Sequence, residues 1–137
     1  MHIQFFEKNK KYAPFVLRLA IAAVFLWFGF SQLQNPAMWA EIVPSWAVSF
    51  SGMSAETLVY INGIFEIIGG SMLALGIFVS QVAFLLFLHL LVITSNFGVS
   101  PVGVRDFGLS FATLAIAFFG SDSYCFMRER EKENTIL

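Results

Sequence analysis

Residues 56–78, ETLVYINGIFEIIGGSMLALGIF, are apolar almost throughout and carry a carboxylate, Glu66, near their middle. A helix of about 20 apolar residues crosses a bilayer, so this stretch is long enough to do so. An acid at that depth must face protein, water or a ligand, because hydrocarbon offers it no partner. Gly63, Gly70 and Ala74 fall on the same helical face as Glu66, and small residues let a second helix approach closely. The stretch therefore predicts a tight seam in a membrane bundle, with one titratable group inside it.

The composition of the whole chain is typical of a membrane protein. Of its 137 residues, 58% are hydrophobic and 12% are charged, and the mean hydropathy is +0.75. Soluble domains are about half apolar and a quarter charged. Most lysines and arginines lie near the two ends of the chain, so no basic patch is available for nucleic acid. Cys125 is the single cysteine, which excludes an internal disulfide, a CxxC redox pair and a thiolate metal cluster within one chain.

Four apolar stretches predict an all-α membrane protein whose single domain, residues 13–121, is an antiparallel bundle of four transmembrane helices. Trp39 and Trp46 lie between the first two stretches, in the moderately polar setting that favours the membrane interface, so we expect an interfacial loop or short helix there. Ser54 is placed to cap the second helix. Only a few residues separate the second and third helices, which makes them antiparallel neighbours. The predicted spans are about 13–33, 56–78, 81–98 and 105–120.

A basic leader, residues 1–12, precedes the bundle, and a charged tail, residues 122–137, follows it. Each of these segments holds three lysines or arginines, whereas the loops at the other side of the membrane hold only Arg105. Basic residues accumulate on the cytoplasmic side of membrane proteins. The charge pattern therefore predicts that both ends of the chain are cytoplasmic, as an even number of spans requires.

One face of the first span combines a charge with small and apolar residues. Arg18, Ala22, Phe25, Gly29 and Gln32 share this face at helical spacing. Counting about 1.5 Å per residue places Arg18 about 8 Å in from the leader. Its guanidinium can therefore either extend back to the cytoplasmic surface or point into the bundle.

Polar side chains from all four spans form a candidate seam: Arg18, Asn62, Glu66, His89 and Asp106. At about 1.5 Å per residue, Glu66 and His89 lie at similar depths, so we expect them to be within hydrogen-bonding reach. Arg18 must extend by most of its length to reach Glu66. Asp106 lies near the opposite surface. An alternative at that surface is a rim site formed by Arg105 and Asp106 with Glu56 or Tyr60 of the second span.

Two interpretations of the seam follow from these residues. In the structural one, Glu66 is protonated or hydrogen-bonds to His89, Asn62 or Asn96, and it pins the bundle. In the functional one, the seam binds the head group of a quinone or another lipid-like molecule, and Glu66 or His89 accepts or donates a proton. Neither interpretation assigns a catalytic residue or a metal ligand. The glycines expected to pack between helices are Gly29, Gly63, Gly69, Gly70 and Gly108.

Four stretches in order are similar to a known family: LRLAIAAVFLWFGFSQL at 17–33, PAMWAEIVP at 36–44, GIFEIIGGSMLALG at 63–76 and VRDFGLSFATLAIAFFGS at 104–121. Together they resemble the DoxX family of small four-helix membrane proteins. The most distinctive elements are Arg18, the E-x-x-G-G motif at 66–70 and Asp106, because placed charges distinguish apolar helices that match one another by composition alone.

The resemblance implies an accessory subunit more firmly than a reaction. The family is named for a subunit associated with a terminal quinol oxidase and thiosulfate:quinone oxidoreductase. We therefore expect an accessory subunit of a membrane redox or quinone-linked assembly in a bacterial or archaeal cell membrane, without a redox centre or independent catalysis of its own. The expected partners are the bilayer, redox subunits or a second copy, and no cofactor is expected to be bound covalently. The alternative is that the chain binds a quinone or other lipid-like ligand around Glu66 and His89.

Overall fold

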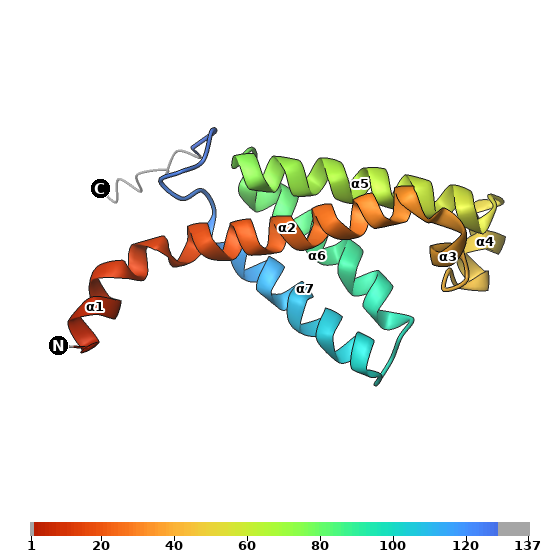
Figure 1. Ribbon diagram of the computed structural model, residues 1–137, viewed down its shortest axis with the longest axis horizontal. Helices are drawn as coiled ribbons and strands as arrows, with labels where there is room; N and C mark the ends of the chain where they lie inside the picture. The colour runs from red at the N-terminus through yellow and green to blue at the C-terminus, as the bar shows by residue number, and fades with distance from the viewer. Residues whose placement is uncertain (1, 129–137) are drawn as a thin grey trace, which may run out of the picture.

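The structure is a computed structural model that describes residues 2–128, and every regular element in this range is helical (Figure 1). Long helices alternate with short connections. The elements are α1 (His2–Asn9), η1 (Lys10–Tyr12), α2 (Ala13–Gln34), α3 (Pro36–Ala40), α4 (Ser45–Ser51), α5 (Ala55–Leu75), α6 (Val79–Ser95) and α7 (Pro101–Phe119).

Among residues 2–128, three helical segments are long and apolar enough to cross a membrane: Ile3–Gln34, Ala55–Leu75 and Pro101–Phe119. The first joins α1, η1 and α2. The fourth apolar helix, α6, is shorter, with 17 residues. At 1.5 Å per residue α6 is about 25 Å long, slightly less than the hydrocarbon core of a typical bilayer.

The helix ends follow local sequence signals. Ser54 caps α5 as expected, since its side chain accepts a hydrogen bond from the Thr57 N–H. This helix ends at Leu75, three residues before the predicted end, because Gly76 adopts a left-handed conformation with φ 72°. The last helix starts four residues earlier than predicted, where the Ser100 side chain accepts from the Gly103 N–H. Arg105 therefore lies inside α7 and does not open it.

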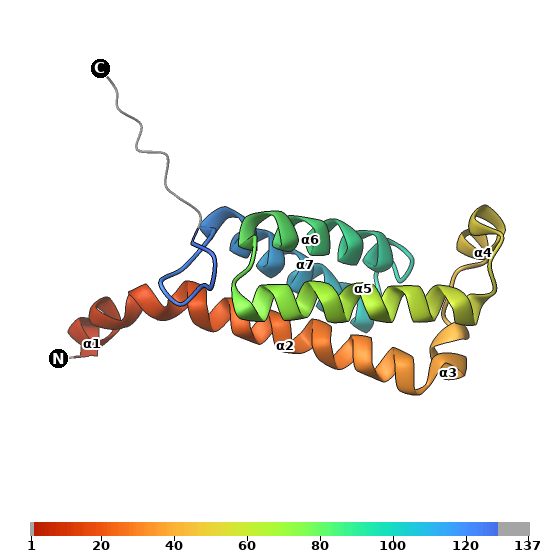
Figure 2. The same ribbon diagram turned by 90° about the horizontal axis from the view of Figure 1, so that it is seen from above.

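The long helices pack as two pairs, α2 with α5 and α6 with α7, and Figure 2 shows α6 and α7 together along one side of α5. Glycines make the first pair close. A Cβ atom on Gly29 would lie 2.8 Å from the Gly63 carbonyl oxygen, and one on Gly70 would lie 3.3 Å from the Ala22 carbonyl oxygen. The buried face of α2 is the predicted one: Arg18, Ala22, Phe25, Gly29 and Gln32.

Two of the other glycines expected to pack between helices, Gly69 and Gly108, do not lie between α2 and α5. Gly69 faces α6, where an added Cβ would lie 2.8 Å from Leu86 Cδ2. Gly108 is exposed on α7, and an added Cβ there would meet nothing within 4 Å. The prediction that Gly108 packs between helices of this chain is therefore wrong, because the face of α7 that meets the bundle carries Asp106, Ser110 and Thr113 instead.

The bundle is tightest near the α5–α6 turn and opens toward α3 and α4. A buried cluster that includes Ala22, Phe25, Leu73 and Leu86 fills the tight half. From there α6 and α7 diverge from α2 and α5 (Figure 1). The space between the two pairs at the open end holds the candidate site.

The segment that follows α7 folds back onto the bundle. The Phe126 N–H donates to the Leu75 carbonyl oxygen at 2.9 Å, and the Met127 N–H donates to the Gly76 carbonyl oxygen at 3.0 Å. The sequence predicts a solvated tail from residue 122, but residues 122–127 lie against the end of α5. The rest of the predicted tail, residues 129–137, is outside the described residues.

Candidate functional site

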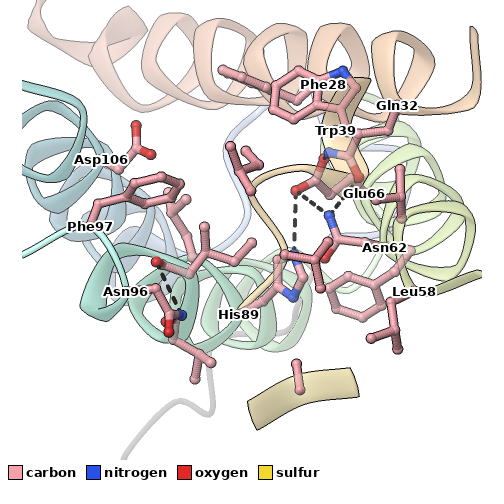
Figure 3. A pocket seen from close by; sticks show the side chains of 18 of the residues that line it. Phe28, Gln32, Trp39, Leu58, Asn62, Glu66, His89, Asn96, Phe97 and Asp106 are labelled. Atoms are coloured by element: carbon pink, nitrogen blue, oxygen red, sulfur yellow. Dashed lines mark hydrogen bonds and ion pairs between the residues drawn. The ribbon is translucent and has the colours of Figure 1, made fainter. Parts of the chain in front are cut away.

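A cluster of polar side chains surrounds Glu66 inside the bundle (Figure 3). Gln32 Nε2 donates to Glu66 Oε2 at 2.8 Å, and Asn62 Nδ2 donates to Glu66 Oε1 at 3.2 Å. His89 Nε2 lies 3.3 Å from Glu66 Oε1, so the contact predicted between these two residues is present. Asn62 Nδ2 also donates to Gln32 Oε1 at 2.7 Å. The acid therefore has partners from three helices, α2, α5 and α6.

Helical spacing and close packing place these groups together. Asn62 and Glu66 are four residues apart on α5 and share a face. Gln32 reaches them because the glycine contacts hold α2 close to α5, and it is 5% exposed. It was absent from the predicted site residues, although its position on the buried face of α2 was predicted. Its hydrogen-bond partners could not be found from one helix alone.

The cluster faces a cavity of about 800 Å³ between the two helix pairs. Most of the lining is apolar and much of it is aromatic, including Phe28, Trp39, Trp46, Phe65 and Phe97. Polar side chains enter at a few places only: Gln32, Asn62, Glu66, His89, Asn96, Arg105 and Asp106. Ligand sites in proteins commonly combine an apolar wall of this size with a few placed polar groups.

The connection between α2 and α5 supplies one wall of the cavity. Trp39 on α3 donates to Ser31 Oγ at 3.2 Å and packs edge-on against Phe28, with 5.7 Å between ring centroids. Trp46 on α4 donates at 2.8 Å to Oδ1 of Asn96, the residue that follows α6. The predicted interfacial segment thus consists of two short helices, and its tryptophans connect the two sides of the cavity.

Arg105 and Asp106 lie on the α7 side of this cavity. Arg105 Nε donates to Asp106 Oδ1 at 2.8 Å, and its guanidinium carbon lies 5.6 Å from the centroid of the Phe28 ring. Asp106 is 6% exposed. Glu56 and Tyr60 do not line the cavity, so the prediction that one of them forms a rim site with Arg105 and Asp106 is wrong.

Arg18 belongs to a second polar cluster, at the tight end of the bundle. Its Nε donates to Asp122 Oδ2 at 2.7 Å, and its Nη1 donates to the carbonyl oxygens of Leu73 and Ala74 at 2.6 and 2.7 Å. The guanidinium is buried, so it does not extend to the surface. Its placement in one seam with Glu66 is also wrong, because the guanidinium binds carbonyl groups in the last turn of α5 and Asp122, three residues after the end of α7.

Asp122 was not predicted to take part in any site, because it appeared to open a solvated tail. Burial raises the pKa of this carboxyl, but hydrogen bonds from Arg18 and from the Tyr124 N–H, with the charge of Arg18, hold it below its ordinary value. Burial raises the pKa of the Cys125 thiol nearby. A thiol with a raised pKa is a poor nucleophile at neutral pH.

Residues 2–128 contain no group of three His, Cys, Asp or Glu side chains arranged to hold a metal ion.

The long apolar helices, the small residues between them and the enclosed polar cluster define the chain as an all-helical membrane protein. The model of the DoxX family matches residues 13–99, and the chain belongs to this family, which confirms the resemblance. The match covers α2 to α6 and ends before α7, so it does not include Asp106. No curated protein and no solved structure matched the chain.

Proposed function

We propose that this protein binds a lipid-like molecule, with a quinone-type ring as the candidate head group, in the cavity beside Glu66. The supporting observation is that an apolar cavity of about 800 Å³ ends on the cluster of Gln32, Asn62, Glu66 and His89. Such a cavity suits a molecule with a long apolar part and a small hydrogen-bonding end. A buried acid with no cavity beside it would favour a purely structural role.

The proposal includes an orientation in the membrane. The helices α2, α5, α6 and α7 cross as an antiparallel bundle, with both termini on the cytoplasmic side. This orientation is supported by Lys8, Lys10 and Lys11 before α2 and Arg128 after α7, and by the tryptophans of α3 and α4 at the other end. The cavity then opens in the half of the membrane away from the cytoplasm.

Membership of the DoxX family supports an accessory role for such a binding protein in a redox or quinone-linked assembly. A subunit of this kind presents a quinone to a partner that carries the redox centre, so it needs no electron carrier of its own. Cross-linking in native membranes tests this role. Failure to recover any stable partner would count against it.

Binding to the purified protein in lipid nanodiscs tests the ligand proposal. The probes are a decyl-substituted benzoquinone and its hydroquinone, and the affinity is measured by isothermal titration calorimetry. We expect Glu66→Gln to lose up to about tenfold in affinity, because one hydrogen bond contributes about 0.5–1.5 kcal/mol net. Glu56→Gln is the matched control, since it makes the same change on an exposed part of α5 outside the cavity.

Two results would contradict the proposal. One is the absence of binding of either probe to the unaltered protein. The other is a Glu66→Gln variant whose melting temperature falls while its affinity for the tighter probe stays unchanged. The second result would leave Glu66 with the structural role alone.

A further inference from the structure

We infer that the cavity selects a head group that donates hydrogen bonds, a phenolic hydroxyl in preference to a carbonyl. This inference rests on the proposed function, since it concerns the ligand of the same cavity. For a quinone-type molecule, it means that the reduced, hydroxyl-bearing form binds more tightly than the oxidised form. Around Glu66, most hydrogen-bond donors already have partners within the protein, whereas several acceptors have room for another bond.

The donors of the cluster are largely occupied by the protein itself. Asn62 has two N–H groups on Nδ2, and its two bonds go to Gln32 Oε1 and Glu66 Oε1. Gln32 Nε2 uses one of its two N–H groups on Glu66 Oε2. In the tautomer of His89 that donates from Nε2 to Glu66 Oε1, the other ring nitrogen, Nδ1, is an acceptor.

The unused hydrogen-bonding capacity of the cluster is therefore mainly that of acceptors. Glu66 Oε2 accepts a single bond among the described residues, and a carboxylate oxygen has room for a second. The carbonyl oxygen of Asn62 accepts no hydrogen bond within residues 2–128. One N–H of Gln32 is the donor that remains. A hydroxyl group finds several acceptors here, whereas a carbonyl oxygen competes for one N–H.

Two of the three indole groups in the cavity wall, those of Trp39 and Trp46, are occupied in the same way, whereas Trp27 is 63% exposed. An aromatic-lined site usually offers the N–H groups of its tryptophans to a ligand. Here Trp39 Nε1 donates to Ser31 and Trp46 Nε1 donates to Asn96. These donors are used to hold α3 and α4 in place, so they do not offset the excess of acceptors at Glu66.

The charged side chains that line the cavity also favour a head group that donates hydrogen bonds. Two carboxyl groups, Glu66 and Asp106, face the cavity together with one guanidinium, that of Arg105. Arg105 holds the other free N–H groups, but its side chain is 52% exposed, and it is paired with Asp106 on α7. An anionic head group is therefore disfavoured in this cavity, and a neutral hydroxyl fits the region around Glu66.

Three matched probes test the inference on the unaltered protein in nanodiscs: a decyl-substituted hydroquinone, the corresponding benzoquinone and the dimethyl ether of the hydroquinone. The ether keeps the ring and the tail but cannot donate. Calorimetric titration under anaerobic conditions keeps the hydroquinone reduced. We expect the hydroquinone to bind about tenfold more tightly than either other probe, as one additional hydrogen bond implies.

The outcomes separate the inference from the proposed function. Equal or tighter binding of the benzoquinone overturns the inference and leaves the proposed function standing, whereas no binding of any probe overturns both. Tight binding of the ether also overturns the inference, since it shows that the hydroxyl hydrogens are not recognised. Glu66→Gln adds an N–H donor at the acid's position, so we expect it to reduce the hydroquinone preference, and Glu56→Gln should retain it. The probe comparison itself needs no variant to fold.

Discussion

Replacement of Gly29 by alanine tests the contact that brings Gln32 to Glu66. A Cβ atom on Gly29 would lie 2.8 Å from the Gly63 carbonyl oxygen and 2.7 Å from Ile67 Cγ1. Ordinary contacts of a Cβ start near 3.4 Å, so α2 and α5 must separate by roughly half an ångström to admit the methyl group. One of the obstructing atoms belongs to the backbone of α5, and no change of rotamer can relieve that contact.

The expected size of the effect comes from two opposing contributions. Alanine stabilises a helix interior by about 0.5–1 kcal/mol relative to glycine, and overpacking costs about 1–3 kcal/mol. We therefore expect Gly29→Ala to lower the free energy of unfolding by about 1 kcal/mol. Gly108→Ala is the matched control, because an added Cβ there has nothing within 4 Å. Gly108→Ala keeps only the gain in helix stability, without overpacking, so it should raise the free energy of unfolding by about 0.5–1 kcal/mol.

Thermal unfolding in detergent micelles measures both variants. The signal can be the reactivity of the Cys125 thiol, which packs against Gly76, with circular dichroism as a second probe. We expect the two melting temperatures to move in opposite directions from that of the unaltered protein. If Gly29→Ala raises the melting temperature as much as Gly108→Ala does, α2 and α5 do not approach as described, and the geometry of the Glu66 cluster fails with them.

Two further predictions concern the Arg18 cluster. The pKa of Asp122 is lowered in the folded state from an ordinary value of 3.8, so its stabilising contribution is complete above that value and is lost as the pH falls through the lowered one. Melting temperature should accordingly decline below about pH 4, and Asp122→Asn should be less stable at neutral pH with a flatter acid profile; an unchanged profile would contradict this. Arg18→Leu removes the cationic partner of the buried Asp122 carboxylate and the hydrogen bonds from Nη1 to two carbonyl groups, and we expect a loss of about 3–5 kcal/mol in denaturant titration. Replacing both Arg18 and Asp122 by leucine should cost less than the sum of the two single changes, whereas strict additivity would show that the pair is not coupled.

The cavity explains why the α2–α5 connection is built as it is. In an interfacial loop with no cavity beside it, the tryptophans would only contact the membrane surface. Here Trp39 and Trp46 each form a hydrogen bond to a long helix or to the residue that follows it, with Ser31 and Asn96 as acceptors. Their indole rings therefore serve as the wall of a site whose other walls are transmembrane helices.

Some features of the site could be predicted because they depend on one helix or on one short turn. The buried face of α2 follows from a 3.6-residue period. The contact between Glu66 and His89 follows from counting residues on either side of the turn at Gly76, since a short turn fixes the relative depth of two helices. In both cases the information is local in the sequence.

Other features depend on pairings between distant segments, and no local pattern encodes them. Arg18 was predicted to share a seam with Glu66 at the edge of its reach, but its partner Asp122 is 104 residues away along the chain. Gln32 and Asn62 meet because glycines on α2 and α5 face each other and let the two helices approach closely. Gly108 looked like a packing glycine, yet the rotation of α7 in the bundle turns it outward.

The sequence by itself determined that this is an all-helical membrane protein of the DoxX family, with an acid among small residues in its second long helix. Hydropathy and helical period suffice for the membrane class and for the position of the acid, because a bilayer demands long apolar helices and penalises an unpartnered charge. The family follows from placed motifs such as E-x-x-G-G at 66–70 and from the match of the family model. Only the tertiary structure decided which groups surround Glu66, and that Arg18 is not one of them. It also decided that the two helix pairs diverge to leave a cavity, because that depends on how the side chains of α2, α5, α6 and α7 pack against one another, which no single stretch specifies.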